Sequence, residues 1–375
     1  MGKMYTALGL MSGTSMDGVD ASIIQSDGET KYKVIKDKYF EYPQGIYEGL
    51  TKLRDKINNH RDLKNFSSEL KNIEKEITLF HIKAINEILK ESKENIDLLG
   101  FHGQTIYHNA KEKISKQLGD GKLLSQLTKK TIVYNFREND LKNGGEGAPL
   151  TPIFHKMLAK KFKIVPATFL NLGGIANETN VYEDYGFHAS DTGPGMCLID
   201  QWIRLNSKKK YDKNGEIAKS GKINRSILEK ALKNLEFEHF KLKKRDPLWF
   251  EKSISYDIKD FNFDFVRGLS LEDGAATLTE YTAHRLLPSL NISNLCKDTI
   301  VLCGGGRKNK FLINSIKKYN IPLKFIDDYG IDGDFVESQA FAYLAIRSYL
   351  NLPISFSATT GVKKPCTGGT IVKAK

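Results

Sequence analysis

The sequence predicts an α/β protein in which one structural unit occurs twice. The order strand–strand–strand–helix–strand–helix begins near residue 5 and again near residue 167. Both copies contain strands that end in glycine turns, and open α/β sheets bind ligands at the carboxyl ends of their strands. The length of 375 residues suits two domains of ordinary size. We therefore expect two lobes, each with candidate binding turns along one edge of its sheet.

The first copy opens with an antiparallel meander. Short β-type segments occur at Tyr5–Leu10, Val19–Ser26 and near Tyr32–Phe40, and Asp27-Gly28 is typical of a hairpin turn. From Asn65 to Glu91, apolar residues recur every three or four positions, which predicts a long amphipathic helix.

Two shorter strands complete the first copy. They are predicted at Ile96–Gly100 and Thr131–Phe136, and a glycine-rich loop follows at residues 143–149. A loop of this composition suits a domain boundary or a crossing through the active site. We therefore divide the chain into an N-terminal lobe, residues 1–148, and a C-terminal lobe, residues 149–375.

The second copy repeats this order. Its predicted strands are Thr168–Leu172, Glu178–Tyr182, Phe187–Ser190, Thr299–Cys303 and Leu323–Ile326. Its predicted helices are Leu271 to about Leu287, Phe311–Lys317 and Phe335–Tyr349, with further helices between residues 196 and 250.

The charge balance raises the question of nucleic-acid binding. Lys and Arg number 57 against 45 Asp and Glu, a net charge of +12. The basic runs at residues 129–130, 208–210 and 243–245 are short and lack interleaved aromatic residues, and no nucleic-acid-binding motif accompanies them. We expect these lysines to lie on solvated surfaces, with no nucleic-acid partner.

The remaining composition predicts a cytoplasmic protein with no membrane partner. The first residues lack the apolar core of a signal peptide, and no stretch of about 18 apolar residues occurs. The four cysteines show no C-x-x-C spacing, so we expect reduced thiols and no zinc site.

Two glycine turns are candidates for nucleotide binding. Residues 13–18 (Gly-Thr-Ser-Met-Asp-Gly) follow the first strand and offer hydroxyls and backbone amides to a phosphate. They lack the Gly-Lys-Ser/Thr of a Walker A loop, and a plain hairpin explains them equally well. Asp17 is a candidate for holding Mg²⁺ through water. Gly304–Gly306 follow another strand and suit a nucleoside, although a simple crossover turn also fits.

Two polar sites follow other strands. Asp191 precedes Thr-Gly-Pro-Gly, where a carboxylate suits a general base, and capping of the following helix is an alternative or additional role. His102 and Gln104 are predicted on a turn, where Gly103 favours close approach of a ligand. A purely structural role for the single histidine is the alternative.

Many short motifs, in order along nearly the whole chain, resemble one family. They begin with LMSGTSMDGVD at residues 10–20. The others are His102–Thr105, Gly119–Gly121, Asn135–Arg137 with Asp140, Gly144–Leu150, Asn171–Asn177, Asp191–Gly195, Ala276–Glu280, Cys303–Gly306, Asp332–Asp334 with Glu337, and Ala340–Ala342. Together they make the chain similar to the anhydro-N-acetylmuramic acid kinase family.

This resemblance implies a two-lobed, duplicated ribonuclease H-like fold of the actin, sugar kinase and Hsp70 superfamily, with an active-site cleft between the lobes. It implies that ATP, with Mg²⁺, and water convert 1,6-anhydro-N-acetylmuramic acid into N-acetylmuramic acid 6-phosphate and ADP. It also implies a cytoplasmic homodimer that serves peptidoglycan recycling and amino-sugar catabolism.

The resemblance also implies roles for individual residues. Asp191 is the expected catalytic base. The expected ATP- and phosphate-binding residues are Gly13, Thr14, Ser15, Met16, Asp17, Gly18, Val19, Asp20, Gly173, Gly174, Gly304, Gly305 and Gly306. The expected substrate contacts are His102, Gln104, Arg137, Asn171, Asn177 and Glu337.

One segment departs from the family pattern, and two other functions stay open. Where Lys-Ser-x-x-Arg is expected, the chain has Lys252-Ser253 but Tyr256 in place of the arginine. A nucleic-acid or scaffold protein would use the positive charge instead. A glycosidase would open the sugar with two opposed carboxylates and no ATP.

Overall fold

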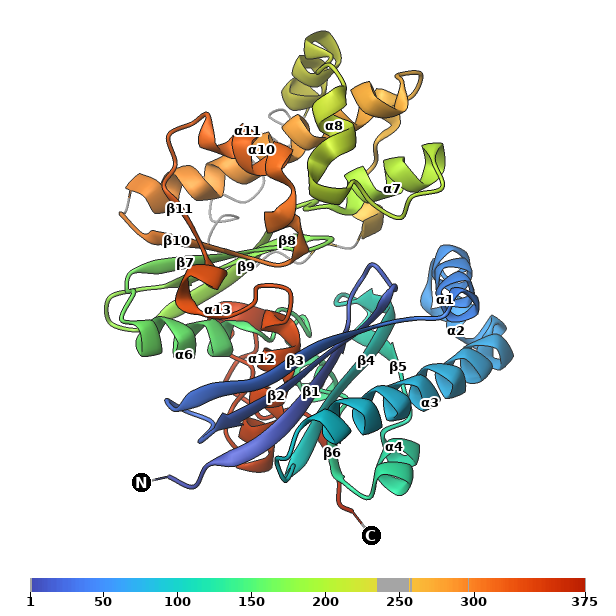
Figure 1. Cartoon of the computed structure of the whole chain (residues 1–375), viewed down its shortest axis with the longest axis vertical. Coiled ribbons are helices and arrows are strands. Elements are labelled where there is room, and N and C mark those ends of the chain that lie inside the picture. Colours follow the sequence, from blue (N-terminus) through green and yellow to red (C-terminus); the bar gives the residue numbers. More distant parts are fainter. Residues whose placement is uncertain (1, 235–255, 257, 296, 375) are drawn as a thin grey trace. The chain divides into compact units, whose positions relative to one another are not determined.

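The computed structural model describes residues 2–234, 256, 258–295 and 297–374 (Figure 1). The basic run at 243–245 and the pair Lys252-Ser253 lie outside these residues. The chain forms two compact units. Unit 1 comprises Met1–Lys163 and Asp334–Lys375, and unit 2 comprises Ile164–Gly333.

These units differ from the division at residues 148 and 149. The helix α6 (Pro152–Phe162) and the whole segment from Asp334 onward belong to unit 1. Helix α12 (Val336–Tyr349) packs directly on the unit 1 sheet, at Gly9 and Gly100, which pair in register. A Cβ on Gly9 would lie 1.9 Å from a backbone oxygen of α12, and one on Gly100 would lie 2.3 Å from another. The absence of these two side chains admits the helix, so the C-terminal segment returns to unit 1.

The unit 1 sheet has the order β12-β6-β4-β1-β2-β3, with β5 paired to β4. The strands β1, β2 and β3 form the predicted antiparallel meander, and β1, β4 and β6 are parallel. The strand bounds are β1 Tyr5–Ser12, β2 Gly18–Ser26, β3 Tyr32–Glu41, β4 Leu98–Asn109, β5 Ile114–Leu118, β6 Thr131–Tyr134 and β12 Thr370–Val372.

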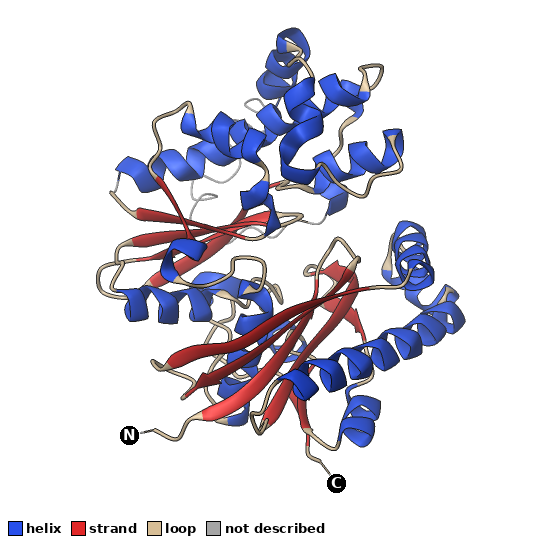
Figure 2. Cartoon of the chain, viewed as in Figure 1, coloured by secondary structure: helices blue, strands red, loops and turns tan. Residues whose placement is uncertain are grey.

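The helices of unit 1 cover both faces of this sheet (Figures 1 and 2). Their bounds are α1 Gln44–Lys56, α2 His60–Asn65, α3 Ser67–Glu91, α4 Gly121–Thr128, α5 Glu138–Lys142, α6 Pro152–Phe162, α12 Val336–Tyr349 and α13 Ser357–Thr360. The predicted long helix is therefore correct apart from a break at Phe66, which separates α2 from α3.

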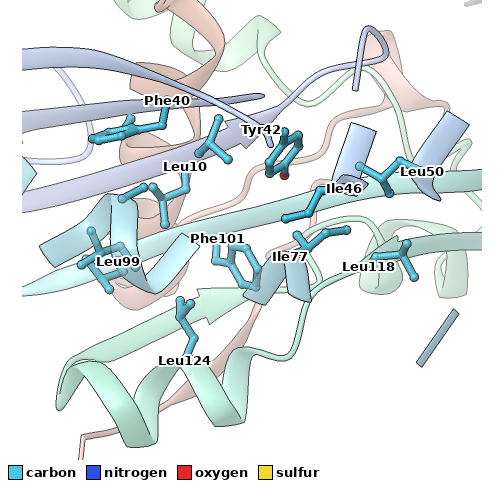
Figure 3. Close-up of a cluster of buried hydrophobic side chains, with 14 of the residues drawn as sticks. Leu10, Phe40, Tyr42, Ile46, Leu50, Ile77, Leu99, Phe101, Leu118 and Leu124 are labelled. Atoms are coloured by element: carbon cyan, nitrogen blue, oxygen red, sulfur yellow. The ribbon is translucent and has the colours of Figure 1, made fainter. Parts of the chain in front are cut away.

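The core of unit 1 lies on the face opposite α12. Side chains alternate along a strand, so Leu8 and Leu10 point away from the face to which Gly9 belongs. They join a buried cluster with residues of α1, α3 and α4, part of which Figure 3 shows around Leu10, Leu99 and Phe101. This packing holds the carboxyl ends of β1 and β4 in place.

Unit 2 contains a second sheet, with the order β11-β10-β7-β8-β9. Its elements are β7 Ala167–Leu172, β8 Ala176–Val181, β9 Phe187–Gly193, α7 Cys197–Asn206, α8 Glu216–Ser220, α10 Leu271–Leu295, β10 Thr299–Cys303, α11 Lys310–Lys317 and β11 Leu323–Phe325. Residues 225–234 are also helical. Helix α10 runs past the predicted end at Leu287 and contains Pro288.

Two clusters form the core of unit 2. In one, Leu170 and Leu172 of β7 pack with apolar residues of α10 and α11. In the other, Trp202 of α7 packs with residues of α8, Val266 and the start of α10.

The two sheets share one topology. In unit 1 the path β6-β4-β1-β2-β3 has two parallel pairs followed by two antiparallel pairs. In unit 2 the path β11-β10-β7-β8-β9 has the same sequence of pairings. The predicted duplication is therefore confirmed strand by strand. No helix in the described part of the chain has the length and apolar character needed to cross a membrane.

Candidate active site

The turn between β1 and β2, residues 13–17, is the first candidate site. Met16 takes a left-handed conformation (φ 57°), its side chain is buried, and its amide donates to the carbonyl of Gly13 at 3.1 Å. Thr14 and Ser15 are exposed, and the Ser15 hydroxyl donates to Asp17 Oδ1 at 2.5 Å. The buried Met16 side chain anchors the turn, which presents its two hydroxyl residues to solvent.

Side chains from other elements hold this turn at both ends. At the Gly18 end, the carbonyl of Asp17 accepts hydrogen bonds from the Tyr42 amide at 2.8 Å and the Tyr39 hydroxyl at 3.0 Å. Gly18 has no room for a side chain, because a Cβ would lie 2.4 Å from the Phe40 carbonyl oxygen. The turn is thus fixed to β3 and to the residue that follows it.

Gln104 holds the other end of the turn. It lies inside β4, and the prediction that His102 and Gln104 occupy a turn was wrong. Gly103 has a left-handed φ of 73° within the strand, so the glycine marks an irregularity in the strand instead of its end. The Gln104 side chain is buried, and its Nε2 donates to the Gly13 carbonyl at 2.9 Å.

The other amide atom of Gln104 is also engaged. Its Oε1 accepts the Ser12 hydroxyl at 2.6 Å, and Ser12 in turn accepts the Tyr42 hydroxyl at 3.1 Å. We call Ser12, Tyr42 and Gln104 the turn clamp. Sequence reasoning missed Ser12 and Tyr42, since nothing local marks two residues 30 positions apart as partners. Because both ends of its amide bind the protein, Gln104 suits positioning of the turn better than contact with a substrate.

His102, Arg137 and Glu337 come together in unit 1. His102 is buried, its Nδ1 lies 2.8 Å from the Gly103 carbonyl, and its Nε2 lies 3.0 Å from Arg137 Nη2. The carbonyl accepts only from an N–H, so Nδ1 carries the proton and Nε2 accepts from the guanidinium. Burial, together with the Arg137 charge, lowers the pKa of His102 to about 3 and keeps the ring neutral.

Glu337, at the start of α12, is the acidic member of this group. Burial raises the pKa of its carboxyl, while the positive charge of Arg137 acts in the opposite direction. The Arg137 Nη1 also donates to the Gly147 carbonyl at 2.8 Å, which ties the group to the glycine-rich loop. Three residues that are far apart in the sequence therefore form one polar group around the Arg137 guanidinium.

The glycine-rich loop is organised by Asp140, a residue to which sequence reasoning gave no role. Its side chain is fully buried, and Oδ1 accepts the Gly147 amide at 2.6 Å. Its Oδ2 accepts the Thr360 hydroxyl at 2.5 Å. This carboxylate links residues 140–147 to the C-terminal segment within unit 1.

In unit 2, four of the strands place polar residues in one row. Across neighbouring strands, Cys303 pairs with Asn171, Asn171 pairs with Asn177, and Asn177 pairs with Asp191. The row lies at the carboxyl ends of the parallel strands β10 and β7, where sheets of this kind bind ligands. The register thus brings together Asn171, Asn177 and Asp191, three of the residues to which the family resemblance gives roles.

Asp191 is the half-buried end of this row. It lies within β9, so the expectation that it follows the strand was wrong. It also does not cap α7, whose N-cap is Met196. The pairing of β8 with β9 shifts by one residue directly after Asp191, which places a β-bulge at Thr192. Bulges redirect neighbouring side chains and are frequent beside active sites. Asp191 Oδ2 accepts the Tyr256 amide at 2.8 Å.

The glycine turns of unit 2 meet beside the row. A Cβ on Gly304 (φ 80°) would lie 2.3 Å from Asn171 Oδ1, and one on Gly195 would lie 2.4 Å from the Gly173 carbonyl oxygen. The Gly173 and Gly174 carbonyls accept the amides of Met196 and Cys197, both at 2.9 Å. Only glycine permits this close approach of three turns.

Arg307 fixes the Gly304–Gly306 turn from behind. Its buried guanidinium binds both carboxylate oxygens of Asp327, each at 2.7 Å, and donates to the Gly304 carbonyl at 3.1 Å. The same hydrogen bonds lower the pKa of Asp327. Sequence reasoning gave this arginine no role.

Parts of both glycine turns are suited to a nucleotide. A Cβ added to Gly305 would meet no atom within 4 Å, and one on Gly13 would meet only the Ser15 hydroxyl at 4.0 Å. A ligand can therefore approach the backbone closely at both residues.

No group of three or more His, Cys, Asp or Glu among the described residues is suited to binding a metal. Mg²⁺ characteristically binds one or two carboxylates together with phosphates and water, which agrees with Asp17 as a single donor.

The duplicated topology and the row of polar residues define the class of this protein. It is a duplicated α/β protein with candidate ligand turns at the strand ends of each unit. Residues 5–374 match the family model of anhydro-N-acetylmuramic acid kinase. The chain belongs to this family.

Relatives named as anhydro-N-acetylmuramic acid kinases match this chain over nearly its full length. The chain is 54% identical over 383 residues to the anhydro-N-acetylmuramic acid kinase of Pelagibacter ubique, with 100% of both chains covered. It is 38% identical to that of Zymomonas mobilis, with 97% of this chain and 99% of the other covered. Among solved structures, it is similar to the (R)-2-hydroxyglutaryl-CoA dehydratase component A of Acidaminococcus fermentans. The TM-score is 0.42 and the identity 12%, over 92% of this chain and 99% of that one.

Proposed function

We propose that this protein uses ATP and water to convert 1,6-anhydro-N-acetylmuramic acid into N-acetylmuramic acid 6-phosphate, with release of ADP. Membership of the kinase family supports the reaction class. The observation that carries the assignment of the site is the row Asn171–Asn177–Asp191, which ends beside the Gly304 turn. We further propose that the enzyme is a cytoplasmic homodimer that serves peptidoglycan recycling and amino-sugar catabolism.

We assign Asp191 as the base of the reaction. Its carboxylate takes a proton from water as the water oxygen forms a bond to C1 of the sugar. The bond between C1 and O6 breaks, and O6 then attacks the γ-phosphorus while ADP leaves. A base must reach the proton that it removes, and the pairing shift directly after Asp191 is an irregularity of the kind found beside active sites. One carboxylate thus serves both ring opening and phosphoryl transfer.

We assign the β1–β2 turn together with the first residues of β2, residues 13–20, to the phosphates of ATP. Gly173, Gly174 and Gly304–Gly306 are assigned to the rest of the nucleotide. The exposed Thr14 and Ser15 and the open backbone at Gly13 support the first assignment. The exposed, open backbone at Gly305 supports the second. Mg²⁺, when bound, neutralises charge on the transferring phosphoryl group, and Asp17 is the residue that would hold it.

We assign the group around Arg137 to the sugar. Arg137 is a cation that suits the carboxylate of the muramic acid, because a guanidinium binds a carboxylate with two parallel hydrogen bonds. Neutral His102 orients this guanidinium through Nε2. Glu337 and the two asparagines, Asn171 and Asn177, supply further polar contacts for hydroxyl and amide groups of the sugar.

The substitution Asp191→Asn tests this proposal. It keeps the size of the side chain and removes its basicity, so we expect turnover to fall by about 10³-fold or more with ATP binding unchanged. ADP release and formation of the phosphorylated sugar are measured together, with and without ATP. Wild-type turnover in this variant would remove Asp191 as the base. Opening of the sugar without ATP would instead indicate a glycosidase.

A further inference from the structure

A main-chain amide reaches Asp191 from a distant part of the chain. The Tyr256 N–H donates to Asp191 Oδ2 at 2.8 Å, across 65 positions of sequence. Both residues belong to unit 2. A hydrogen bond from an amide to a carboxylate stabilises the charged form and restricts rotation of the carboxylate plane. This contact therefore acts on the very group assigned as the base.

The amide has an anchor of its own. The Tyr256 ring packs on the Phe261 ring, with centroids 5.1 Å apart and planes at 56°. Phe261 in turn packs against the buried cluster around Trp202, and its amide donates to the Ile258 carbonyl at 3.2 Å. The position of the Tyr256 backbone is thus set by the core of unit 2, through an aromatic contact.

We infer that the Tyr256 main-chain amide is a positioning group for Asp191, holding one carboxylate oxygen so that the carboxylate meets water in a fixed orientation. The inference rests on the proposed function, in which Asp191 is the base. It assigns a role to the backbone at position 256 and gives the Tyr256 side chain only the task of anchoring that backbone. The amide also favours the ionised carboxylate, which extends the range in which the base is active toward lower pH.

The test removes this single N–H. The amide at Tyr256 is replaced by an ester, by incorporation of the α-hydroxy analogue of tyrosine. Loss of a hydrogen bond to a charged group changes an equilibrium about ten-fold or more. We therefore expect kcat to fall about ten-fold, and the acid limb of the kcat/KM profile to move up by about one pH unit. The KM for ATP is expected to stay within about two-fold, because the ester leaves the glycine turns unchanged.

A matched control uses the same chemistry nearby. An ester at Phe261 removes the N–H that donates to Ile258, in the same segment but without contact to Asp191. This control is expected to lower the melting temperature and leave the pH profile in place. Equal shifts of the acid limb in both esters would overturn the inference, since the shift would then reflect the segment and not the contact.

The failure of this inference is distinguishable from that of the proposed function. Asp191→Asn is measured alongside. Full turnover in Asp191→Asn overturns the role of Asp191 and the inference with it. An inactive Asp191→Asn together with a wild-type rate and profile in the Tyr256 ester overturns only the inference. If the ester protein does not melt cooperatively, Tyr256→Pro, which also lacks the N–H, is compared with Tyr256→Phe, which retains both the N–H and the ring that packs on Phe261. Identical pH profiles of these two variants also overturn the inference.

Discussion

Replacing Gln104 with leucine tests whether the turn clamp positions the β1–β2 turn. The substitution keeps a similar volume and removes all hydrogen bonds of the side-chain amide. In the structure these bonds join the amide to Ser12 Oγ at 2.6 Å, to the Gly13 carbonyl at 2.9 Å and to the Thr105 carbonyl at 3.3 Å. Their loss affects both the stability of unit 1 and the position of the turn.

The expected cost follows from these partners. Three net hydrogen bonds are worth about 3 kcal/mol in free energy of unfolding, at about 1 kcal/mol each. Two partners keep another bond, because the Ser12 hydroxyl still has the Gly18 carbonyl at 2.9 Å and the Gly13 carbonyl still accepts the Met16 amide. Few polar groups are therefore left buried without a partner. We expect the free energy of unfolding to fall by about 2 kcal/mol, less than the full value of the three bonds. A looser turn is expected to raise the KM for ATP about ten-fold.

The assay combines urea unfolding with steady-state kinetics. Gln117→Leu is the matched control. Gln117 lies on the neighbouring strand β5, and in the described structure its side-chain amide hydrogen-bonds only with Thr105 Oγ1 and Ser115 Oγ. This control is expected to cost about 1 kcal/mol and leave the KM for ATP unchanged. If Gln104→Leu and Gln117→Leu change the KM equally, the clamp has no part in nucleotide binding and the reasoning is refuted.

Two further predictions concern a buried histidine and the Arg307 turn. His81 is fully buried and donates from Nδ1 to the Ile77 carbonyl, and burial lowers its pKa to about 4. The unfolded state takes up the proton first, so stability is complete above about pH 6.5 and falls toward pH 4, by on the order of 1 kcal/mol per pH unit. Urea unfolding of His81→Phe at pH 7 and 5 is expected to show a smaller loss than the wild type, and an equal loss would contradict this account. Arg307→Lys breaks the two-point contact with Asp327 and is expected to raise the KM for ATP about ten-fold, whereas the exposed Arg267→Lys leaves it unchanged; equal kinetics in the two would argue against the turn.

Local patterns were sufficient for most elements of the fold. The amphipathic period of α3 and the alternation in β1, β2 and β3 depend on neighbours close in sequence. These elements could therefore be predicted from the sequence alone. The glycine turns at residues 13 and 304 were found for the same reason. At Gly103 this logic failed, because a glycine within a strand has the same local signal as a glycine that ends one.

Long-range packing settled the rest. No local signal places α12 with unit 1; the contact depends on the absence of side chains at Gly9 and Gly100, more than 200 positions away. Likewise, the type of residue marked Gln104 as a candidate, but the partners of its amide show that it holds the turn.

The chain's residue order alone was enough to indicate the duplicated α/β fold, the family, and Asp191 as the candidate base. Its short motifs carry that information because each is read within a few residues. The tertiary structure was needed to join Asn171, Asn177 and Asp191 in one row and to bring the Tyr256 amide to Asp191. Strand register and main-chain contacts arise from the packing of whole elements. Every residue except proline has the same main-chain amide, so only the fold shows which partner that amide binds.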